Sequence, residues 1–368
     1  MSPAYPSLYQ VNTRVLLTAL SRTLGRPATL DDIPDAELDR IAGLGFDYVW
    51  LLSVWRTGSA GQRVSSAHAG WRHEFEDTLP DLCAEDIAGS GFAITGYTAH
   101  PAVGGTAALA RTRRRLQARG LKLMLDFVPN HMALDHPWVE DHPDYYVGAG
   151  ELEQTRAPQN YTWVKRMRGD VLLAHGRDPY FDGWPDTLQL DYANPATQEA
   201  MIGELLVIAE QCDAVRCDMA MLVLPKIFER TWVYWDPEST MMQEGFDYAY
   251  DKRLYDRLRE GHARLVREHL WAGLDYQNRL ARFMENHDEP RAAPTFASGM
   301  HEAAAQAYLA APGSRSARAR RRLAAPGSRS AATYDRDGGR RPRARPLSRP
   351  SAVGLPRLRA DGAVTRRR

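Results

Sequence analysis

The chain has 368 residues, of which 44% are hydrophobic and 25% charged, so it can bury a large core as one α/β domain or two smaller ones. No run approaches the roughly 20 apolar residues that span a bilayer, so we expect no membrane insertion. The net charge of +1 is uneven, because residues 311–368 hold 17 Arg and three Asp and leave the remainder strongly acidic. This excess of acid argues against nucleic-acid binding by the folded part.

The cysteines and the first residues bear on the cellular setting. The three cysteines, Cys83, Cys212 and Cys217, are an odd number without the spacing of a disulfide framework. The opening MSPAYPSLYQ has no charged segment followed by an apolar one. We therefore expect a soluble, cytoplasmic protein.

Short apolar runs alternate with helical segments along the chain. The pattern predicts strands buried on both faces at 46–55, 122–128, 213–220 and 283–287, and the start of a later strand at 245–251. It predicts a helix over 110–119 that stops at Gly120, and one over 194–211 with Asn194 as N-cap and Pro195 as first residue. This order indicates a βα architecture with a parallel sheet.

The stretch from His131 to about Leu190 is too long for an ordinary βα connection of about 2 to 6 residues. It predicts a functional insertion. The alternative is a disordered linker, but the segment is rich in aromatic residues, which disorder tolerates poorly. These residues are Tyr145, Tyr146, Tyr161, Trp163, Tyr180, Phe181 and Trp184.

The composition changes from Tyr308 onward. LAAPGSRS occurs at 309–316 and again at 323–330, and Arg, Ala, Pro, Gly and Ser dominate to the end, which predicts disorder. One interpretation is a basic arm for nucleic acid or another polyanion. The other, which we favour, is translation in a shifted reading frame, because the tail follows the helix-like HEAAAQAYLA without a linker.

The motif VRCD at 215–218 lies in a predicted strand, where alternate side chains share a face. Arg216 and Asp218 are therefore expected to pair. The guanidinium keeps the carboxylate ionised, as a nucleophile that attacks the anomeric carbon of a sugar must be. Taken alone, the motif is equally compatible with a structural ion pair.

Two more predicted strand ends carry related side chains. DFVPNH contributes Asp126, Asn130 and His131, and ENHDEP contributes His287 and Asp288. Neutral His and ionised Asp suit sugar hydroxyls, because both form directional hydrogen bonds and a carboxylate can accept from two hydroxyls. Each pair on its own also fits a packing or loop role.

In this order, DFVPNH, VRCD and ENHD resemble the conserved regions of the α-amylase superfamily, glycoside hydrolase family 13. QLDYANP at 189–195 and GFAITGY at 91–97 are similar to further motifs of that family, and the resemblance covers about residues 9–300. It implies an α/β fold, an eight-stranded (β/α) barrel of the TIM type with a small domain inserted after the third strand. It also implies retaining cleavage of α-glucosidic bonds in α-glucans or α-glucosides.

By this resemblance Asp218 is the nucleophile and Asp288 stabilises the transition state. The substrate-binding set that it implies is Arg216, His131, His287, Asp126, Tyr97 and Phe92. Phe92 stands where the family usually stacks a Tyr, and Gly96 stands where an Asp precedes Tyr97. Asn130 matches a position that binds calcium in some members, but we expect a packing role here and no metal or other cofactor.

The proton donor of this chemistry is missing from the sequence. Retaining glycosidases need two carboxyl groups about 5 to 5.5 Å apart. By resemblance the donor precedes VYWD, where this chain has Trp232, whose indole cannot transfer a proton. Only 26 positions separate Asp218 from 245–251, whereas two βαβ steps need on the order of 60 residues.

The spacing therefore predicts an internal deletion over the fifth strand, and the arginine-rich tail begins where an eighth strand belongs. An incomplete barrel is expected, with its first part at 1–131, the inserted domain at 132–190, its second part at 191–307 and the tail at 308–368. Glu238, Glu244 and Glu285 are the carboxylates that could replace the donor, and their alternative role is solvated surface.

Three functions remain open. The first is an α-amylase-type glycosidase for oligosaccharides or α-glucosides, impaired by the missing donor. The second is a non-catalytic glycan-binding or scaffold protein derived from that family. The third is a nucleic-acid binder that acts through the arginine-rich tail, and we expect no nucleic-acid or membrane partner for the folded part.

Overall fold

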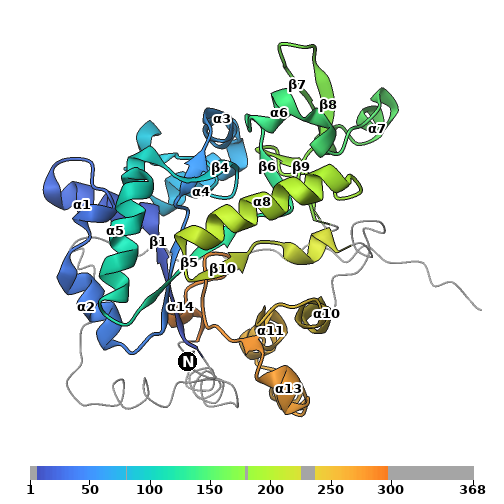
Figure 1. Ribbon diagram of the computed structural model, residues 1–368. Coiled ribbons are helices and arrows are strands. Elements are labelled where there is room, and N and C mark those ends of the chain that lie inside the picture. The colour runs from blue at the N-terminus through green and yellow to red at the C-terminus, as the bar shows by residue number, and fades with distance from the viewer. Residues whose placement is uncertain (1–5, 80, 179–180, 225–236, 297–368) are drawn as a thin grey trace, which may run out of the picture. The chain divides into compact units, whose positions relative to one another are not determined.

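The computed structural model describes residues 6–79, 81–178, 181–224 and 237–296 (Figure 1). The chain divides into two compact units, Met1–Ala325 and Pro326–Arg368, and the second lies outside the described residues. Residues 225–236 around the predicted deletion, which include Trp232, and the predicted tail at 308–368 also lie outside them. The fold below is that of the first unit.

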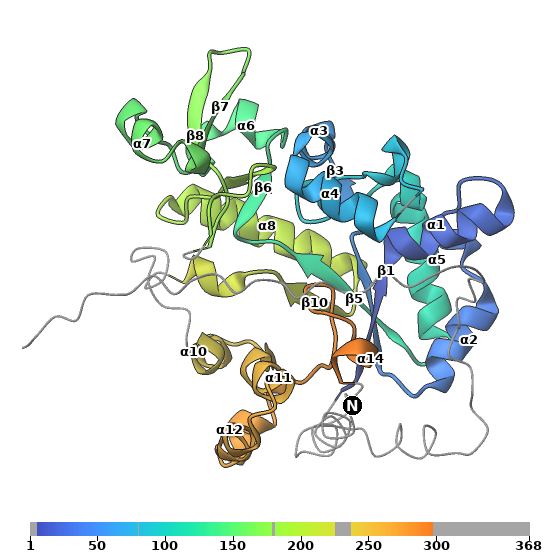
Figure 2. The ribbon, with the colours of Figure 1, turned by 180° about the vertical axis from the view of Figure 1, so that it is seen from behind.

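The centre of the fold is a four-stranded sheet in the order β1-β2-β5-β10 (Figures 1 and 2). All its pairings are parallel. The strands are β1 Leu8–Asn12, β2 Tyr48–Leu52, β5 Lys122–Phe127 and β10 Ala214–Cys217. The predicted strands at 46–55, 122–128 and 213–220 are confirmed, and β1, which the apolar pattern did not predict, forms one edge.

Strand β2 is shorter than the apolar run that predicted it. Ser53 follows it with a left-handed backbone, φ +67°, which an extended strand cannot contain. The chain resumes as β3 (Trp55–Thr57), which pairs antiparallel with β4 (Ile94–Ala99) outside the central sheet. Between them lie α3 (Ser59–Ala67), α4 (Ala69–Thr78) and the short helix η2 (Ala84–Asp86).

Helices connect the parallel strands and cover the sheet. They are α1 Thr13–Leu24, η1 Leu30–Asp32, α2 Asp35–Gly43, η3 Pro101–Val103, α5 Gly105–Gln117 and α8 Pro195–Gln211. Both predicted helices are confirmed, and Asn194 caps α8 by accepting a hydrogen bond from the Ala196 amide at 3.0 Å. Leu123 and Leu125 of β5 and Leu116 of α5 are 0% exposed, so the core lies between the sheet and these helices.

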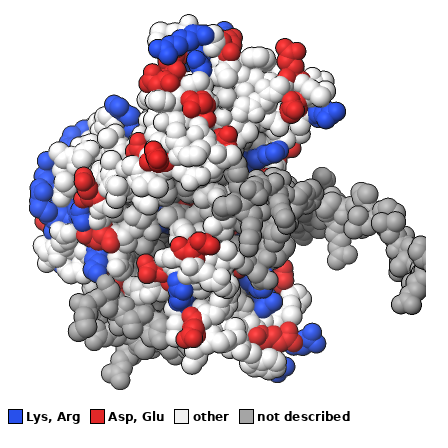
Figure 3. All heavy atoms as spheres, turned by 45° about the vertical axis from the view of Figure 1, so that its right-hand side comes forward, with Lys and Arg blue, Asp and Glu red and all other residues white. Residues whose placement is uncertain are grey.

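Ion pairs join α5 to the segment of η1 and α2, which lies beside it in Figures 1 and 2. Arg111 contacts Asp31 at 2.6 Å, Arg115 contacts Asp35 at 3.0 Å, and Arg119 contacts Asp39 at 2.6 Å. Both sets repeat every four residues, the spacing that keeps side chains on one helix face. On the surface drawn in Figure 3, acidic and basic side chains are interspersed over the described residues.

The chain between β5 and α8 is folded, so the alternative of a disordered linker is wrong. It contains two antiparallel pairs, β6 (His131–Ala133) with β9 (Thr187–Gln189), and β7 (Tyr161–Val164) with β8 (Val171–Ala174). Its helices are α6 Trp138–Asp141, η4 Pro143–Tyr145, α7 Glu151–Arg156 and η5 Pro158–Asn160. We call residues 131–189 the inserted region.

The described residues after β10 are mostly helical. Their elements are η6 Ala220–Val223, α10 Pro237–Gln243, β11 Ala249–Tyr250, α11 Lys252–Arg259, α12 Ala263–His269, α13 Leu274–Gln277, β12 Leu280–Ala281 and α14 Ala292–Thr295. The predicted strand at 283–287 is wrong, because β12 ends at Ala281. Its parallel partner β11 stops at Tyr250, because Asp251 begins α11 by accepting the Leu254 amide at 3.1 Å. Among the described residues, no strand therefore continues beside 283–287.

Candidate active site

The carboxyl ends of β5 and β10 bring three charged side chains together. Asp126 and Arg216 are register partners on these strands. Arg216 Nη1 lies 2.5 Å from Asp218 Oδ1 and 3.5 Å from Asp126 Oδ1, so the ion pair predicted from the spacing of VRCD is present. The Asp218 amide still donates to Phe127 O at 2.7 Å, and Met219 then leaves the strand with φ +47°. A left-handed backbone at a non-glycine residue is strained and recurs at functional sites.

Aromatic rings surround the Arg216 guanidinium. Its Cζ lies 5.1 Å from the ring centroid of Trp50, 5.4 Å from that of Phe92 and 5.9 Å from that of Tyr250. Burial by itself lowers the pKa of Arg216, but the negative charge of Asp218 and the other partners outweigh it and raise the pKa overall. The cation is therefore permanent, and the rings shield it from water.

Asp126 lies behind Arg216 in the interior. It is 2% exposed, its Oδ2 accepts a hydrogen bond from Trp50 Nε1 at 3.0 Å, and its Oδ1 has no hydrogen-bond partner among the described residues. Burial raises the pKa of Asp126 to about 7, although Arg216 and Trp50 act in the opposite direction. The predicted contact of Asp126 with a sugar therefore finds no support, and its geometry is that of a side chain that positions Arg216.

His131 begins the inserted region, and the charge of Asp218 affects its pKa. Burial lowers the pKa of His131 to about 4, and the Asp218 carboxylate offsets only part of this effect. The imidazole is therefore neutral near pH 7, with its ring edge-on to Trp184 at 5.1 Å between centroids. A neutral ring can both donate and accept a hydrogen bond.

The neighbouring Asn130 is held in the core. Its Oδ1 accepts from Gln189 Nε2 at 3.0 Å, and its carbonyl accepts from the Leu190 amide at 3.1 Å. These bonds fit the packing role expected of it. In the part of the chain that the structure describes, no three His, Cys, Asp or Glu side chains are grouped so that they could hold a metal ion.

His287 and Asp288 follow β12. His287 Nδ1 lies 3.1 Å from Gln10 Nε2, and its ring is edge-on to Trp50 at 5.2 Å and tilted against Phe92 at 5.5 Å. Burial lowers the pKa of His287, while the carboxylates of Asp288 and Asp218 raise it and Arg216 lowers it further. His287 thus lies within the influence of both aspartates.

Asp288 itself is directed toward solvent. Its side chain is 65% exposed, and its Oδ2 lies 3.2 Å from His287 Nε2. Within the described ranges, no hydrogen bond or ion pair joins Asp288 to Asp218 or Arg216. The loop therefore brings His287 to the cluster around Arg216 and leaves Asp288 at its margin.

Tyr97 is not brought to this cluster. It is 2% exposed, and its hydroxyl donates to Val128 O at 3.2 Å and accepts from the Val128 amide at 2.9 Å. Both functions of the hydroxyl are thus used by the backbone that follows β5, which makes Tyr97 a core residue. Phe92, by contrast, is half-buried and lies over Arg216.

Three residues of the site were missed in the sequence, namely Gln10, Trp50 and Tyr250. Gln10 is a half-buried polar residue of β1, and its side chain contacts His287. Trp50 lies within the predicted run 46–55, but only the parallel register of β2 and β5 shows that its indole reaches Asp126. Tyr250 gave no comparable signal.

The carboxylates that could replace the proton donor have other surroundings. Glu285 accepts the Ala292 amide at 2.7 Å and lies 3.5 Å from Arg291, while Glu244 is exposed. Glu238 lies on α10 with a buried Oε2 that has no hydrogen-bond partner among the described residues. In the described ranges none of the three pairs with Arg216.

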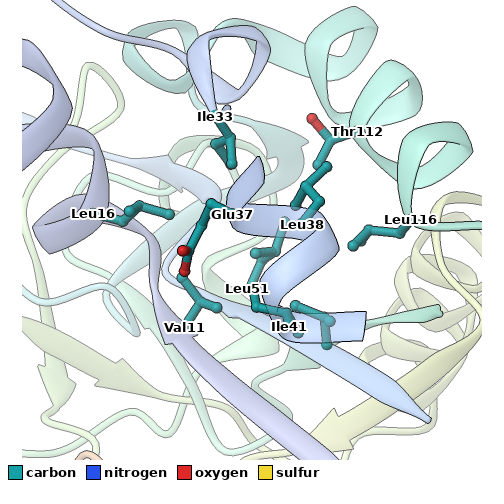
Figure 4. A pocket seen from close by; sticks show the side chains of 10 residues that line it. Val11, Leu16, Ile33, Glu37, Leu38, Ile41, Leu51, Thr112 and Leu116 are labelled. Carbon is teal, nitrogen blue, oxygen red and sulfur yellow. The ribbon is translucent and has the colours of Figure 1, made fainter. Parts of the chain in front are cut away.

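A hollow between β1, β2, α2 and α5 is unrelated to this site (Figure 4). Its volume is about 10 Å³, and most of its lining is apolar, including Val11, Leu38 and Leu116. This is the room of about one water molecule. The hollow is a small packing gap and no binding site.

The sequence is similar to a protein family and to known proteins. The model for "Alpha amylase, catalytic domain" matches residues 29–229, more than half of the chain. Maltase 1 of Drosophila virilis is 35% identical over 103 residues, which are 24% of this chain and 16% of the relative. The alpha-1,4-glucan:maltose-1-phosphate maltosyltransferase of Salinibacter ruber is 31% identical over 129 residues, 32% of this chain and 17% of the relative. The chain thus matches about a sixth of the length of these two relatives.

The fold has counterparts among solved structures. The alpha-amylase from Lactobacillus plantarum has a TM-score of 0.54 and 19% sequence identity, with coverage of 80% of this chain and 66% of that one. Together with the family model, this confirms the predicted (β/α)8 fold class. The described residues supply four adjacent parallel strands and one separate parallel pair, which is less than a closed eight-stranded barrel.

Proposed function

The chain belongs to the α-amylase catalytic-domain family, and from this premise we propose that it is an impaired α-amylase-type glycoside hydrolase. It would act with retention on the α-glucosidic bonds of α-glucans or α-glucosides. The observation that supports this most is the Asp218–Arg216 ion pair of 2.5 Å at the end of β10, with neutral His131 beside it. We retain the proposed layout of barrel (1–131 and 191–307) and inserted domain (132–190).

In the first step Asp218 attacks the anomeric carbon, and the bond from that carbon to the leaving-group oxygen breaks with its electron pair on the oxygen. Arg216 holds the carboxylate in position through the ion pair of 2.5 Å. Neutral His131 and His287 would exchange hydrogen bonds with sugar hydroxyls. Asp288 would supply negative charge opposite the developing oxocarbenium ion, after the loop that carries it moves inward.

The departing oxygen needs a proton that this chain cannot supply if Trp232 occupies the donor position. A leaving group that is stable as an anion needs no proton. We therefore expect release of fluoride from α-glucosyl fluoride, with little or no cleavage of starch. In the second step water also needs a base, whereas azide does not, so azide should accelerate turnover.

The experiment measures fluoride release with and without azide and identifies the sugar product. The expected product is α-glucosyl azide, because two displacements at the same carbon retain its configuration. Asp218→Asn should abolish the reaction, while Asp213→Asn, a carboxylate paired with Arg113 at 2.6 Å elsewhere, should not. Starch hydrolysis as fast as fluoride release would contradict the missing donor, and fluoride release by the Asp218→Asn chain would contradict the nucleophile.

The second candidate is a glycan-binding or scaffold protein without turnover. It is favoured by the solvent-directed side chain of Asp288, which makes no hydrogen bond or ion pair with Asp218 or Arg216 among the described residues. Calorimetric binding of maltooligosaccharides, combined with no fluoride release, would select this candidate. The third candidate rests on the arginine-rich tail, which lies outside the described residues.

A further inference from the structure

A second hollow lies between α3 and the inserted region, which adjoin each other in Figures 1 and 2. Its volume is about 420 Å³, within the range of about 300 to 1,000 Å³ that is usual for ligand sites. We call it the insertion groove and define it by six of its lining residues, Arg63, Asp135, His136, Glu140, Trp163 and Arg166. It shares no lining residue with the cluster around Arg216.

His136 presents an unused donor to this groove. The side chain is buried, with 5% exposure, and its Nδ1 accepts the Trp138 amide at 3.2 Å. Burial lowers the pKa of His136 to about 4, so the ring is neutral and its proton lies on Nε2. This N–H has no acceptor among the described residues, so it can donate to a ligand.

Two more polar atoms of the lining are buried and unpaired. Glu140 accepts the Met167 amide through Oε2 at 3.0 Å, but its Oε1 has no hydrogen-bond partner among the described residues. The same holds for Nε of Arg166. The lining therefore carries charged groups of both signs, and a ligand that has both hydrogen-bond donors and acceptors suits it.

An aromatic side chain completes the lining. Trp163 is 50% exposed, and its Nε1 donates to Gln154 Oε1 at 3.1 Å, which fixes the plane of the indole. An exposed and oriented indole offers a large apolar face at little cost in side-chain entropy. The apolar C–H face of a sugar ring is complementary to it.

The wall on the side of α3 is preformed. Asp135 Oδ2 accepts the Ala60 amide in the first turn of α3 at 3.0 Å. Gly58 permits this approach, because a Cβ at its position would lie 2.0 Å from Asp135 Oδ1. The inserted region and α3 are thus held together where the groove forms, which lowers the ordering cost of binding.

We propose that the insertion groove binds a neutral oligosaccharide at a site separate from the candidate active site. Hydroxyl groups can accept from His136 and Arg166 and donate to Glu140, and a pyranose ring can stack on Trp163. The lining holds Arg63, Lys165 and Arg166 beside Asp135 and Glu140, so its charges nearly balance and suit a neutral ligand better than a strongly charged one. The groove would hold an α-glucan chain near the catalytic cluster irrespective of turnover.

The test is a calorimetric titration of the full chain with maltoheptaose. Trp163→Ala should weaken one class of sites by about tenfold, the effect of removing one aromatic contact. Glu140→Gln, which preserves the side-chain shape, should weaken the same class. Trp271→Ala removes an indole that is 72% exposed on another surface and should change nothing. Fluoride release from α-glucosyl fluoride should be unchanged in all three variants.

Asp218→Asn separates this proposal from the proposed activity, because it should abolish fluoride release and leave groove binding intact. The proposal is overturned if both groove variants, shown to be folded by circular dichroism, bind maltoheptaose as tightly as the unchanged chain. It is also overturned if Asp218→Asn removes that binding, or if inorganic phosphate binds the groove more tightly than the sugar. A chain that releases no fluoride but loses affinity in both groove variants would support the groove and refute the activity.

Discussion

The protonation of Asp126 can be tested through stability. Burial raises its pKa from the ordinary 3.8 to about 7, so the folded state binds this proton more tightly than the unfolded state. The resulting stabilisation is fully present below pH 3.8 and is lost as the pH rises through about 7. Since each pKa unit corresponds to about 1.4 kcal/mol, ionisation of Asp126 lowers the free energy of unfolding by about 4 kcal/mol.

Asp126→Asn removes this titration while keeping an acceptor for Trp50 Nε1. The assay is urea unfolding of both chains at several pH values between 5 and 8. The free energy of unfolding of the variant, minus that of the unchanged chain, should grow between pH 5 and about 7 and level off toward pH 8. Titration of the buried imidazoles is common to both chains and cancels in the difference.

Asp31→Asn is the matched control. Asp31 is a surface carboxylate whose hydrogen bond from Arg111 lowers its pKa, so it is ionised in both states above pH 5. The free energy of unfolding of Asp31→Asn, minus that of the unchanged chain, should not change between pH 5 and 8. A flat difference for Asp126→Asn as well would show that Asp126 is ionised throughout, and the reasoning from its burial would fail.

Three further changes probe the neighbourhood. Trp50→Phe removes the donor to buried Asp126 and should lower the free energy of unfolding by about 1 to 3 kcal/mol in urea titrations, whereas no loss would mean that the bond is absent. Gly58→Ala forces the Asp135 carboxylate away and should cost about 1 kcal/mol of stability; an unchanged urea midpoint would refute the close approach. Arg119→Ala breaks ion pairs to two aspartates of α2 and should lower the urea midpoint at low salt, with the loss disappearing near 1 M NaCl; a salt-independent loss would point to packing instead.

The central sheet was readable from the sequence where strands are buried on both faces. The runs around Val49 and Leu123 are largely apolar, as parallel strands covered by helices require, and the run around Val215 is apolar except for its charged residues. Strand β1 was not predicted, because the polar residues Gln10 and Asn12 interrupt its apolar pattern. The side chain of Gln10 contacts His287. The polar residue that hid β1 from the sequence pattern is thus a residue of the candidate site.

The candidate site was predictable only as far as local spacing reaches. Arg216 and Asp218 pair because two residues of one strand share a face, a property of any extended chain. The position of Tyr97 depends on residues distant in the sequence, because its hydroxyl is hydrogen-bonded by the backbone of Val128, directly after β5. Similarly, no local sequence pattern predicts that the indole of Trp50 contacts both Asp126 and Arg216.

The cluster around Arg216 has one cation and two carboxylates, and their geometry is unequal. Asp218 lies 2.5 Å from the guanidinium, whereas Asp126 lies 3.5 Å away in a dry interior. A proton taken up by the cluster near neutral pH therefore belongs on Asp126, because burial penalises its charge and the cation compensates it less. In the proposed mechanism, attack by Asp218 and protonation of the leaving group fall to different side chains. We therefore expect a glycosyl-enzyme to form from a fluoride even where the donor position holds Trp232.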